Sequence, residues 1–290
     1  MESGEFMSIQ YSLAHLTAIG CTPPELTRIA ARTGYDFVSL RIMMMKSSNE
    51  LALDYSLAEN PAMLRETRAA LSETGLAVHD IELARIADEV DVKSYLPALE
   101  VGAELGVRNV ISSIWTTDAA RAQDQFNELC DMAQRLGQTI NLEFVTWAAA
   151  GTLGAVAEVV RRSGHANAGI LVDTLHFHRS RTSLDELRAL PRNWFHFVHL
   201  CDAPDPIPTD REGLIFTGRE ERYYLGEGDI DIAAILSCMP PCVYSIELPS
   251  LQKVKEFGAE EHARRCLTRA QQYFAAHPVQ HAADGAGPRG

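Results

Sequence analysis

The sequence lacks any hydrophobic run long enough to cross a bilayer, because its apolar stretches are short and interrupted by charged residues. A membrane-spanning helix needs about 20 consecutive, mostly apolar residues. The chain also opens without the charged and then apolar leader, ending in small residues, that is typical of a secretory signal. We therefore expect a soluble protein with no membrane association.

Clustered cations and dense cysteine patterns are missing as well. There are 26 Lys and Arg residues against 39 Asp and Glu residues, the formal net charge is -13, and no Lys- or Arg-rich block occurs. Phosphate backbones are bound mainly by clustered cations, so a nucleic acid is not the expected partner. Six scattered cysteines without a C-x-x-C pair are typical of free thiols in a reducing cytoplasm. We expect a cytoplasmic protein that acts on a small molecule.

What the sequence does contain is enough apolar material for one large core. Of its 290 residues, 46% are hydrophobic, and one α/β barrel of about 250 residues fits this length. Strand-like stretches alternate with stretches of helical periodicity eight times, which predicts a single (β/α)8 TIM barrel of the α/β class. The expected strands are residues 8–13, 36–42, 76–83, 107–114, 139–143, 168–173, 195–202 and 243–247. The expected helices are residues 23–33, 61–74, 92–105, 118–136, 153–162, a stretch from about 183, 230–237 and 260–275.

The catalytic barrel is expected to occupy residues 7–275. Residues 1–6 precede a second methionine and have no pattern that joins them to the rest, so we interpret them as an expression remnant outside the fold. Residues 276–290 are small and polar and are expected to form a disordered tail.

Two connections, 42–60 and 203–225, are too long for simple turns. Both follow expected strands, and the connections after the strands form the catalytic face of such a barrel. The first contains three consecutive methionines, Met43 to Met45. Core packing is the usual role of methionine, and an apolar wall of the active site is the alternative.

Four of the expected strands end in an acidic residue or a histidine. The run before Asp173 is apolar throughout, which is typical of a strand buried on both faces. Because the carboxyl ends of parallel barrel strands meet on one rim, we expect the four side chains to converge there. We call them the strand-end quartet: Glu143, Asp173, His199 and Glu247.

Three carboxylates and one imidazole form a hard, oxygen-rich set of ligands. Such a set suits Mn²⁺, Mg²⁺ or Co²⁺ better than a closed structural zinc site, which prefers Cys and His. A cation also explains how several carboxylates remain ionised close to one another. Each residue taken alone could equally cap a strand or pair with a surface arginine. The same ending on four strands favours one shared metal site.

These features resemble the xylose isomerase-like TIM barrel family of sugar phosphate isomerases and epimerases, over residues 8 to 275. The family also includes ketose 3-epimerases, inosose dehydratases, 3-dehydroshikimate dehydratases and apurinic endonuclease IV. The resemblance is specific for the family and does not name a reaction. The motifs that carry it are Asn141-Leu-Glu143-Phe, Asp173-Thr-Leu-His176, His199-Leu-Cys-Asp202, Arg222-Tyr-Tyr-Leu-Gly-Glu-Gly228-Asp-Ile-Asp and Ile246-Glu247.

The resemblance implies that the strand-end quartet binds one divalent metal ion, with Mn²⁺ favoured and Mg²⁺, Co²⁺ or Zn²⁺ as alternatives. It also implies that Glu143 and Glu247 are the catalytic acid and base on opposite faces of the substrate. The chemistry is consistent, because proton removal next to a carbonyl leaves an enediolate whose charge a divalent cation stabilises.

Further side chains are expected around the substrate. By the same resemblance, His176 hydrogen-bonds a substrate hydroxyl, and Arg222 holds substrate oxygens or orients Glu247. Glu82 ends the third expected strand and Trp115 follows the fourth, so both are expected to bind the substrate or line its pocket. A structural role remains open for these two.

Two other polar residues near the motifs receive different interpretations. His196 does not match a motif position and is expected to pack outward. Asp202 is expected to orient a ligand or an arginine rather than to bind the metal.

The sequence departs from two members of the family. Endonuclease IV has additional histidines for three zinc ions, whereas an apolar stretch, residues 144–150, follows Glu143 here. A DNA repair enzyme is therefore not expected. The same stretch lacks the extra polar group expected near a dehydroshikimate site.

We therefore expect a divalent-metal-dependent isomerase or epimerase of a small keto sugar or polyol derivative, which acts by proton abstraction next to a carbonyl through an enediolate. A lyase that eliminates water from a keto-polyol, like an inosose or 3-dehydroshikimate dehydratase, shares that enediolate and is the alternative. A non-catalytic ligand-binding barrel is a third hypothesis, which the two glutamates disfavour. Phosphorylation of the substrate stays open, and so does a homo-oligomer formed through exposed helices.

Overall fold

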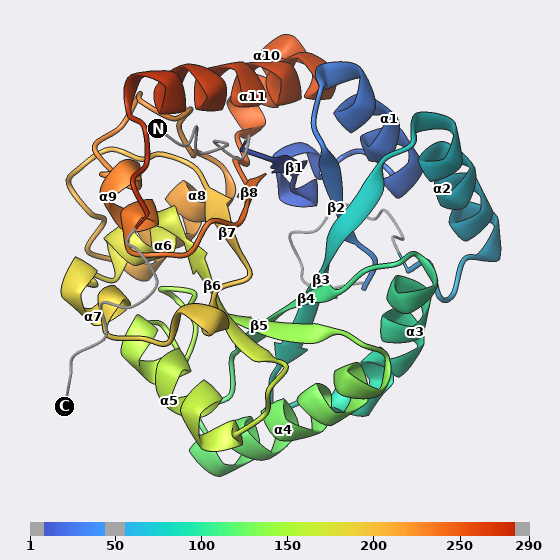
Figure 1. Ribbon diagram of the computed structural model, residues 1–290, viewed down its shortest axis with the longest axis vertical. Coiled ribbons are helices and arrows are strands. Elements are labelled where there is room, and N and C mark those ends of the chain that lie inside the picture. Colours follow the sequence, from blue (N-terminus) through green and yellow to red (C-terminus); the bar gives the residue numbers. More distant parts are fainter. Residues whose placement is uncertain (1–8, 44–55, 282–290) are drawn as a thin grey trace, which may run out of the picture.

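The computed structural model describes residues 9–43 and 56–281. Within them, eight parallel strands form a closed barrel in which neighbours follow chain order and β8 pairs with β1 (Figure 1). The predicted barrel is therefore confirmed. The strands are β1 (Tyr11–Leu13), β2 (Phe37–Arg41), β3 (Ala77–Ile86), β4 (Asn109–Ile114), β5 (Thr139–Glu143), β6 (Ala168–Asp173), β7 (Phe197–Leu200) and β8 (Val243–Ile246).

Helices surround the barrel (Figure 1). The α-helices are α1 (Pro23–Thr33), α2 (Pro61–Thr74), α3 (Leu96–Glu104), α4 (Ala119–Arg135), α5 (Leu153–Ser163), α6 (Thr174–Arg179), α7 (Leu184–Arg188), α8 (Arg211–Arg219), α9 (Ile232–Ser237), α10 (Leu251–Phe257) and α11 (Ala259–Ala276). Three short 3-10 helices are η1 (His15–Ala18), η2 (Val92–Tyr95) and η3 (Arg192–Trp194). None of the described helices has both the length and the apolar character of a membrane span.

Local sequence sets where several helices begin and end. Ser183 Oγ accepts the backbone N–H of Glu186, whose carboxylate accepts the N–H of Ser183, and this is the capping box that the sequence predicts at α7. Gly34 ends α1 with a φ of 93°, a left-handed conformation that glycine adopts without strain.

The alternation of side chains along each strand separates two apolar regions. On β7, Val198 and Leu200 join the large core between the strands and the helices, whereas Phe197 packs inside the barrel with Leu83 and Ile111. Because side chains alternate between faces, His199 points into the barrel like Phe197. The same period places each member of the strand-end quartet on the inner side of its strand.

Strand boundaries differ from the sequence prediction near the rim. β3 extends to Ile86, whereas β7 ends at Leu200 and β8 at Ile246, so Asp202 and Glu247 follow their strands. Three short helices were not predicted: α6 directly after β6, α8 within the long connection after β7, and α10 after β8. All three belong to the rim that carries the quartet.

Parts of the predicted segments lie outside the described residues. These parts are residues 1–8, residues 44–55, which include Met44 and Met45, and residues 282–290. Met43 is described and buried. Within the segment predicted as a tail, Val279 packs against the core and His281 Nδ1 lies 2.9 Å from the carbonyl oxygen of Met239.

Candidate metal centre and binding cavity

The strand-end quartet converges at the carboxyl ends of β5 to β8. Glu143 and Asp173 are the last residues of β5 and β6, His199 lies one residue before the end of β7, and Glu247 follows β8. One donor atom of each side chain lies within 4.8 Å of a donor atom of every other. All four residues are buried, and the most exposed, Glu143, is 8% exposed. The structure therefore brings together the side chains that the sequence singled out.

Burial and crowding shift the pKa values of these groups in different directions. Burial raises the pKa of Glu143 well above its ordinary value, and the nearby Glu247 and Asp173 carboxylates raise it further. Burial acts on Glu247 in the same way, but His199 and Arg222 outweigh it and lower the pKa of Glu247 well below its ordinary value. Burial opposes the charge on His199, yet Glu247 and Glu143 raise its pKa to about 10. Without a bound cation, Glu143 therefore keeps its proton to a higher pH than Glu247 does.

The donor set fits a divalent cation. His199 is 1% exposed, and neither of its ring nitrogens has a hydrogen-bond partner within the described part of the chain. Its Nδ1 faces the carboxylates in ion-pair contacts of 3.5 Å to Glu247 Oε2 and 3.9 Å to Glu143 Oε1. A buried polar atom without a partner costs about 1–3 kcal/mol. A cation between the carboxylates would satisfy this nitrogen and offset the like charges.

Arg222 is buried against two carboxylates of the quartet. Its Nη1 lies 2.6 Å from Asp173 Oδ2, and its Nη2 lies 2.9 Å from Glu247 Oε2. Nε donates to the carbonyl of Gly218 at 2.8 Å, and Nη1 donates to the carbonyl of Glu247 at 3.0 Å. These bonds fix the guanidinium and hold Glu247 in place, which is one of the two roles expected for Arg222.

His176 lies in the first turn of α6, close to the quartet. Its Nδ1 accepts the backbone N–H of Thr146 at 3.4 Å and lies 3.2 Å from Thr146 Oγ1. Burial lowers the pKa of His176 to about 4, so the ring is neutral near pH 7. With Nδ1 as acceptor, the ring proton resides on Nε2. A neutral imidazole of this tautomer can donate a hydrogen bond to a substrate oxygen.

A cavity of about 290 Å³ adjoins the quartet. This volume is near the lower end of the range for small-molecule sites. The four residues expected at the substrate all line it: Glu82, Trp115, His176 and Arg222. Glu143, His199 and Glu247 also line it. A small molecule in this cavity would therefore contact the quartet and the expected substrate-binding residues together.

The side of the cavity formed by β2 to β4 carries further charged groups, and the sequence analysis did not identify all of them. Arg41 Nη2 pairs with Glu82 Oε2 at 3.0 Å, and burial raises the pKa of Glu82. The guanidinium of Arg85 lies 4.7 Å from the ring centre of Trp115, a distance typical of a cation–π contact. Sequence reasoning missed Arg85 because the expected strand stopped at Leu83, before β3 actually ends.

Asp202 does not have the role expected from the sequence. Its carboxylate accepts backbone N–H groups from Ala203 at 2.8 Å, Gly226 at 3.0 Å, Gly228 at 2.9 Å and Ile230 at 3.1 Å. The expectation that it orients a ligand or an arginine is therefore wrong. Asp202 instead organises the backbone of the segment that carries Arg222.

His196 does not pack outward as expected. Its Nδ1 lies 2.7 Å from Oδ1 of Asn141, a residue that faces the barrel interior two positions before Glu143. A Cβ added to Gly169, on the inner side of β6, would lie 2.7 Å from the His196 ring. The side chain therefore fills the amino-terminal end of the barrel, away from the quartet.

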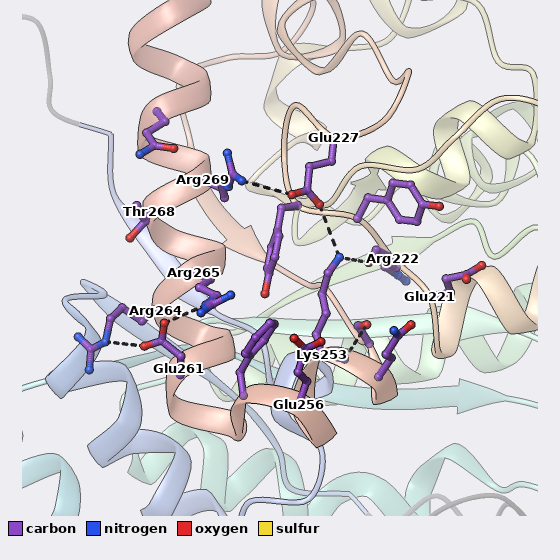
Figure 2. A pocket seen from close by; sticks show the side chains of 16 residues that line it. Glu221, Arg222, Glu227, Lys253, Glu256, Glu261, Arg264, Arg265, Thr268 and Arg269 are labelled. Carbon is purple, nitrogen blue, oxygen red and sulfur yellow. Dashed lines mark hydrogen bonds and ion pairs between the residues drawn. The ribbon is translucent and has the colours of Figure 1, made fainter.

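A larger open depression of about 720 Å³ lies against α10 and α11 (Figure 2). Its cations are paired with carboxylates, since Arg269 and Lys253 contact Glu227 at 3.5 and 3.7 Å and Arg265 contacts Glu261 at 2.8 Å. In the described residues, the strand-end quartet is the group suited to hold a metal, and it lies in the smaller cavity. We therefore assign the functional site to that cavity.

The fold and the site together define a class of protein. It is an eight-stranded TIM barrel in which three carboxylates and one histidine, suited to bind a metal ion, lie buried at the carboxyl ends of the strands. The chain belongs to the xylose isomerase-like TIM barrel family, whose sequence profile matches residues 27–272. Membership places it in the superfamily of sugar isomerases and epimerases, and this confirms the resemblance inferred from the motifs.

Similar proteins agree with this family. An inosose isomerase of Bacillus velezensis is 25% identical over 239 residues, which cover 76% of this chain and 81% of that protein. A 3-dehydroshikimate dehydratase of Pseudomonas putida is 26% identical over 245 residues, which cover 79% of this chain but 35% of that protein. The solved structure of the IOLI protein with a binding zinc atom has a TM-score of 0.77 at 19% identity and covers 94% of this chain and 100% of that chain. The last likeness shows the shared fold.

Proposed function

We propose that this protein is a divalent-metal-dependent isomerase or epimerase of a small keto sugar or polyol derivative. The observation that carries the proposal is the pair Glu143 and Glu247, two buried carboxyl groups that line one cavity and belong to the same group of possible metal ligands. A proton transfer next to a carbonyl needs one group that takes a proton and one that returns it. The likeness to an inosose isomerase supports the same reaction class.

In this reaction, one glutamate takes the proton from the carbon beside the carbonyl and keeps it, and the other glutamate donates its own proton to the opposite face of the enediolate. Arg222 keeps Glu247 oriented through the 2.9 Å contact to Oε2. A divalent cation held by the strand-end quartet supplies electrostatic stabilisation of the negative charge that develops on the substrate oxygens. We propose Mn²⁺ as this ion, because three carboxylates and one imidazole are hard ligands. Mg²⁺, Co²⁺ and Zn²⁺ are the alternatives.

The remaining cavity residues bind the substrate in this proposal. His176 donates its Nε2–H to a substrate oxygen, because Nδ1 is engaged by Thr146. Glu82 Oε1 has no hydrogen-bond partner among the described residues and accepts a hydrogen bond from a substrate hydroxyl. Trp115 provides an aromatic wall on the same side of the cavity.

The test is deuterium uptake from D₂O into recovered ketoses, inososes and related keto-polyols. Metal-loaded wild-type protein is expected to exchange the proton on the carbon next to the carbonyl. Glu143→Gln and Glu247→Gln are each expected to slow this exchange by about 10²–10⁴-fold, because each removes one acid or base. Bound metal is measured in every sample, so that a loss of exchange is compared at equal metal content. No exchange by the loaded wild type across this panel, or exchange in both variants as fast as in the wild type, would contradict the proposal.

A lyase is the second candidate, and Glu82 favours it. Burial raises the pKa of this third cavity carboxyl, so it can hold the proton that a departing hydroxyl needs. The likeness to a 3-dehydroshikimate dehydratase points in the same direction. Release of an unsaturated ketone that absorbs in the ultraviolet would support the lyase. Exchange without such a product would favour the isomerase or epimerase.

A further inference from the structure

Below the quartet, towards the amino ends of the strands, the barrel contains a layer of polar side chains. We call it the inner polar layer: Ser12, Ser39, Asp80 and Ser245, each at most 1% exposed. Ser39 Oγ donates to Asp80 Oδ1 at 2.5 Å and lies 2.9 Å from Ser12 Oγ and 3.4 Å from Ser245 Oγ. TIM barrel interiors are usually filled by bulky branched apolar residues. Burying polar groups costs free energy, which the hydrogen bonds within this layer offset only where an atom has a partner.

Asp80 has one oxygen with partners and one without. Its Oδ1 accepts from Ser39 and lies 2.8 Å from His79 Nδ1. Its Oδ2 has no hydrogen-bond partner among the residues that the structure describes. Asp80 is fully buried, and a buried carboxylate oxygen without a donor is costly. The layer therefore holds Asp80 by Oδ1 and leaves Oδ2 available for a donor inside the barrel.

His199 offers the complementary atom. It pairs in register with Ser245, a member of the inner polar layer, across β7 and β8. Its Nδ1 faces the quartet carboxylates, and its Nε2, on the other side of the ring, also has no partner among the described residues. Ser245 Oγ in turn lies 3.4 Å from Ser39 Oγ, which donates to Asp80, so the layer links the strand of His199 to Asp80 inside the barrel.

We propose that Asp80 is a positioning residue of the metal centre, whose Oδ2 accepts the Nε2–H of His199 across one bridging water. This bond fixes the tautomer and the ring orientation that present Nδ1 to the ion. Histidines that bind metals almost always donate their second ring N–H to a carboxylate, a carbonyl or a water. The inference rests on the metal site of the proposed function.

Glu82 is the competing acceptor, because its Oε1 also has no partner among the described residues. Its Oε2 is engaged by Arg41 at 3.0 Å, and its side chain lines the cavity where a substrate binds. Asp80 is not part of that cavity lining and lies in the enclosed interior. Glu82→Gln is therefore a matched control, since it changes a buried carboxylate on the same strand.

The test measures Mn²⁺ affinity of the full chain by calorimetry and by electron paramagnetic resonance. Asp80→Ala is expected to weaken binding about 10–100-fold, as loss of such a partner does in other metal sites. Asp80→Asn retains an acceptor oxygen and is expected to recover most of the affinity. Glu82→Gln is expected to weaken binding less than Asp80→Ala, because it removes a nearby negative charge but not the partner of His199 in this proposal.

A spectroscopic signature separates positioning from a merely structural role. In the Zn²⁺-loaded wild type, NMR of nitrogen-labelled histidine is expected to show a slowly exchanging proton on Nε2 of His199 and metal on Nδ1. Asp80→Ala should shift that signal or speed its exchange. If circular dichroism shows that Asp80→Ala does not fold, the test uses the His199 Nε2 signal of the wild type and of Asp80→Asn instead.

Three results would overturn the inference: coordination through Nε2, affinity and spectra unchanged in Asp80→Ala, or a loss of affinity in Glu82→Gln as large as in Asp80→Ala. A wild type that binds no metal would overturn the proposed function as well. A wild type that binds metal beside an unaffected Asp80→Ala would overturn this inference alone.

Discussion

At the scale of single residues, Asp173 is the last residue of β6 and the N-cap of α6, and it also pairs with the buried guanidinium of Arg222. Its Oδ1 caps α6 by accepting the N–H of Leu175 at 2.7 Å, and its Oδ2 accepts from Arg222 at 2.6 Å. The cap fixes the direction of the carboxylate at the rim. A sequence that places Asp at the last position of a strand and the N-cap of the next helix therefore aims that carboxylate into the quartet.

The metal content of two variants tests whether the quartet binds an ion. Extensively dialysed wild type is expected to retain about one divalent ion per chain, and Asp173→Asn and His199→Ala are expected to lose most of it, because each removes one of four ligands. Elemental analysis measures the content. His196→Ala is the control, since this histidine lies at the other end of the barrel. A wild type that neither contains metal nor takes up added Mn²⁺ would show that the quartet is not a metal site.

Metal binding should also release protons. Without a cation, the pKa of His199 is raised to about 10 by its carboxylate neighbours against the effect of burial, and that of Glu143 is raised well above its ordinary value by burial first. A ligand must be deprotonated to bind metal, so protons compete with the ion below these pKa values. We expect Mn²⁺ affinity to rise about tenfold per pH unit for each proton released, from about pH 6 to about pH 8.

Calorimetric titrations in two buffers with different ionisation enthalpies measure this proton count directly. His199→Ala is the control and is expected to give little binding heat in either buffer, because it lacks one ligand. An affinity that stays constant or falls as pH rises would contradict the pKa directions inferred for the quartet.

At the scale of elements, the segment after β7 depends on the contact between one carboxylate and one glycine. A Cβ added to Gly228 would lie 2.4 Å from the carbonyl oxygen of Ala203 and 2.5 Å from Asp202 Oδ1. Both atoms are held in place, because Asp202 binds four backbone N–H groups of this region. The close approach, and not an unusual φ, therefore requires glycine at this position.

Gly228→Ala is expected to lower the free energy of unfolding by about 1–3 kcal/mol, since the backbone must shift to admit the methyl group. It should also disturb Arg222 in the same segment and weaken metal binding. Urea unfolding measures the first effect. Gly154→Ala is the control, because Gly154 lies in α5 with no atom within 4 Å of an added Cβ, and alanine favours helix there. Equal stability of both variants would contradict this account.

At the scale of the whole molecule, the quartet connects four consecutive strands, β5 to β8, which are half of the barrel. An ion bound at the rim would interact with all four strands in the folded state and with few of them in the unfolded chain. Metal is therefore expected to stabilise the entire barrel, rather than one loop.

Saturating Mn²⁺ at about 100 times its Kd is expected to add about 2.7 kcal/mol and to raise Tm by about 5–10 °C. Differential scanning calorimetry with Mn²⁺ and with EDTA measures the shift. His199→Ala is expected to show little response to either. An identical Tm with and without Mn²⁺ in the wild type would rule out this linkage.

The sequence by itself determined the barrel and the quartet. Buried parallel strands read as apolar runs, and the alternation of side chains decides which strand-end residue faces inward, so both features are local and periodic. Glu143, Asp173, His199 and Glu247 could be assigned to one rim for this reason. The family motifs then identified His176 and Arg222.

Only the tertiary structure decided which distant groups meet. Asp202 binds the backbone around Gly228 rather than a ligand, His196 turns into the barrel, and Arg85 reaches Trp115 from an extended β3. The short helices α6, α8 and α10 were missed because helices of this length depend on tertiary packing more than on intrinsic propensity. The inner polar layer likewise exists only once the barrel closes, because its members come from β1, β2, β3 and β8 and no sequence period relates them.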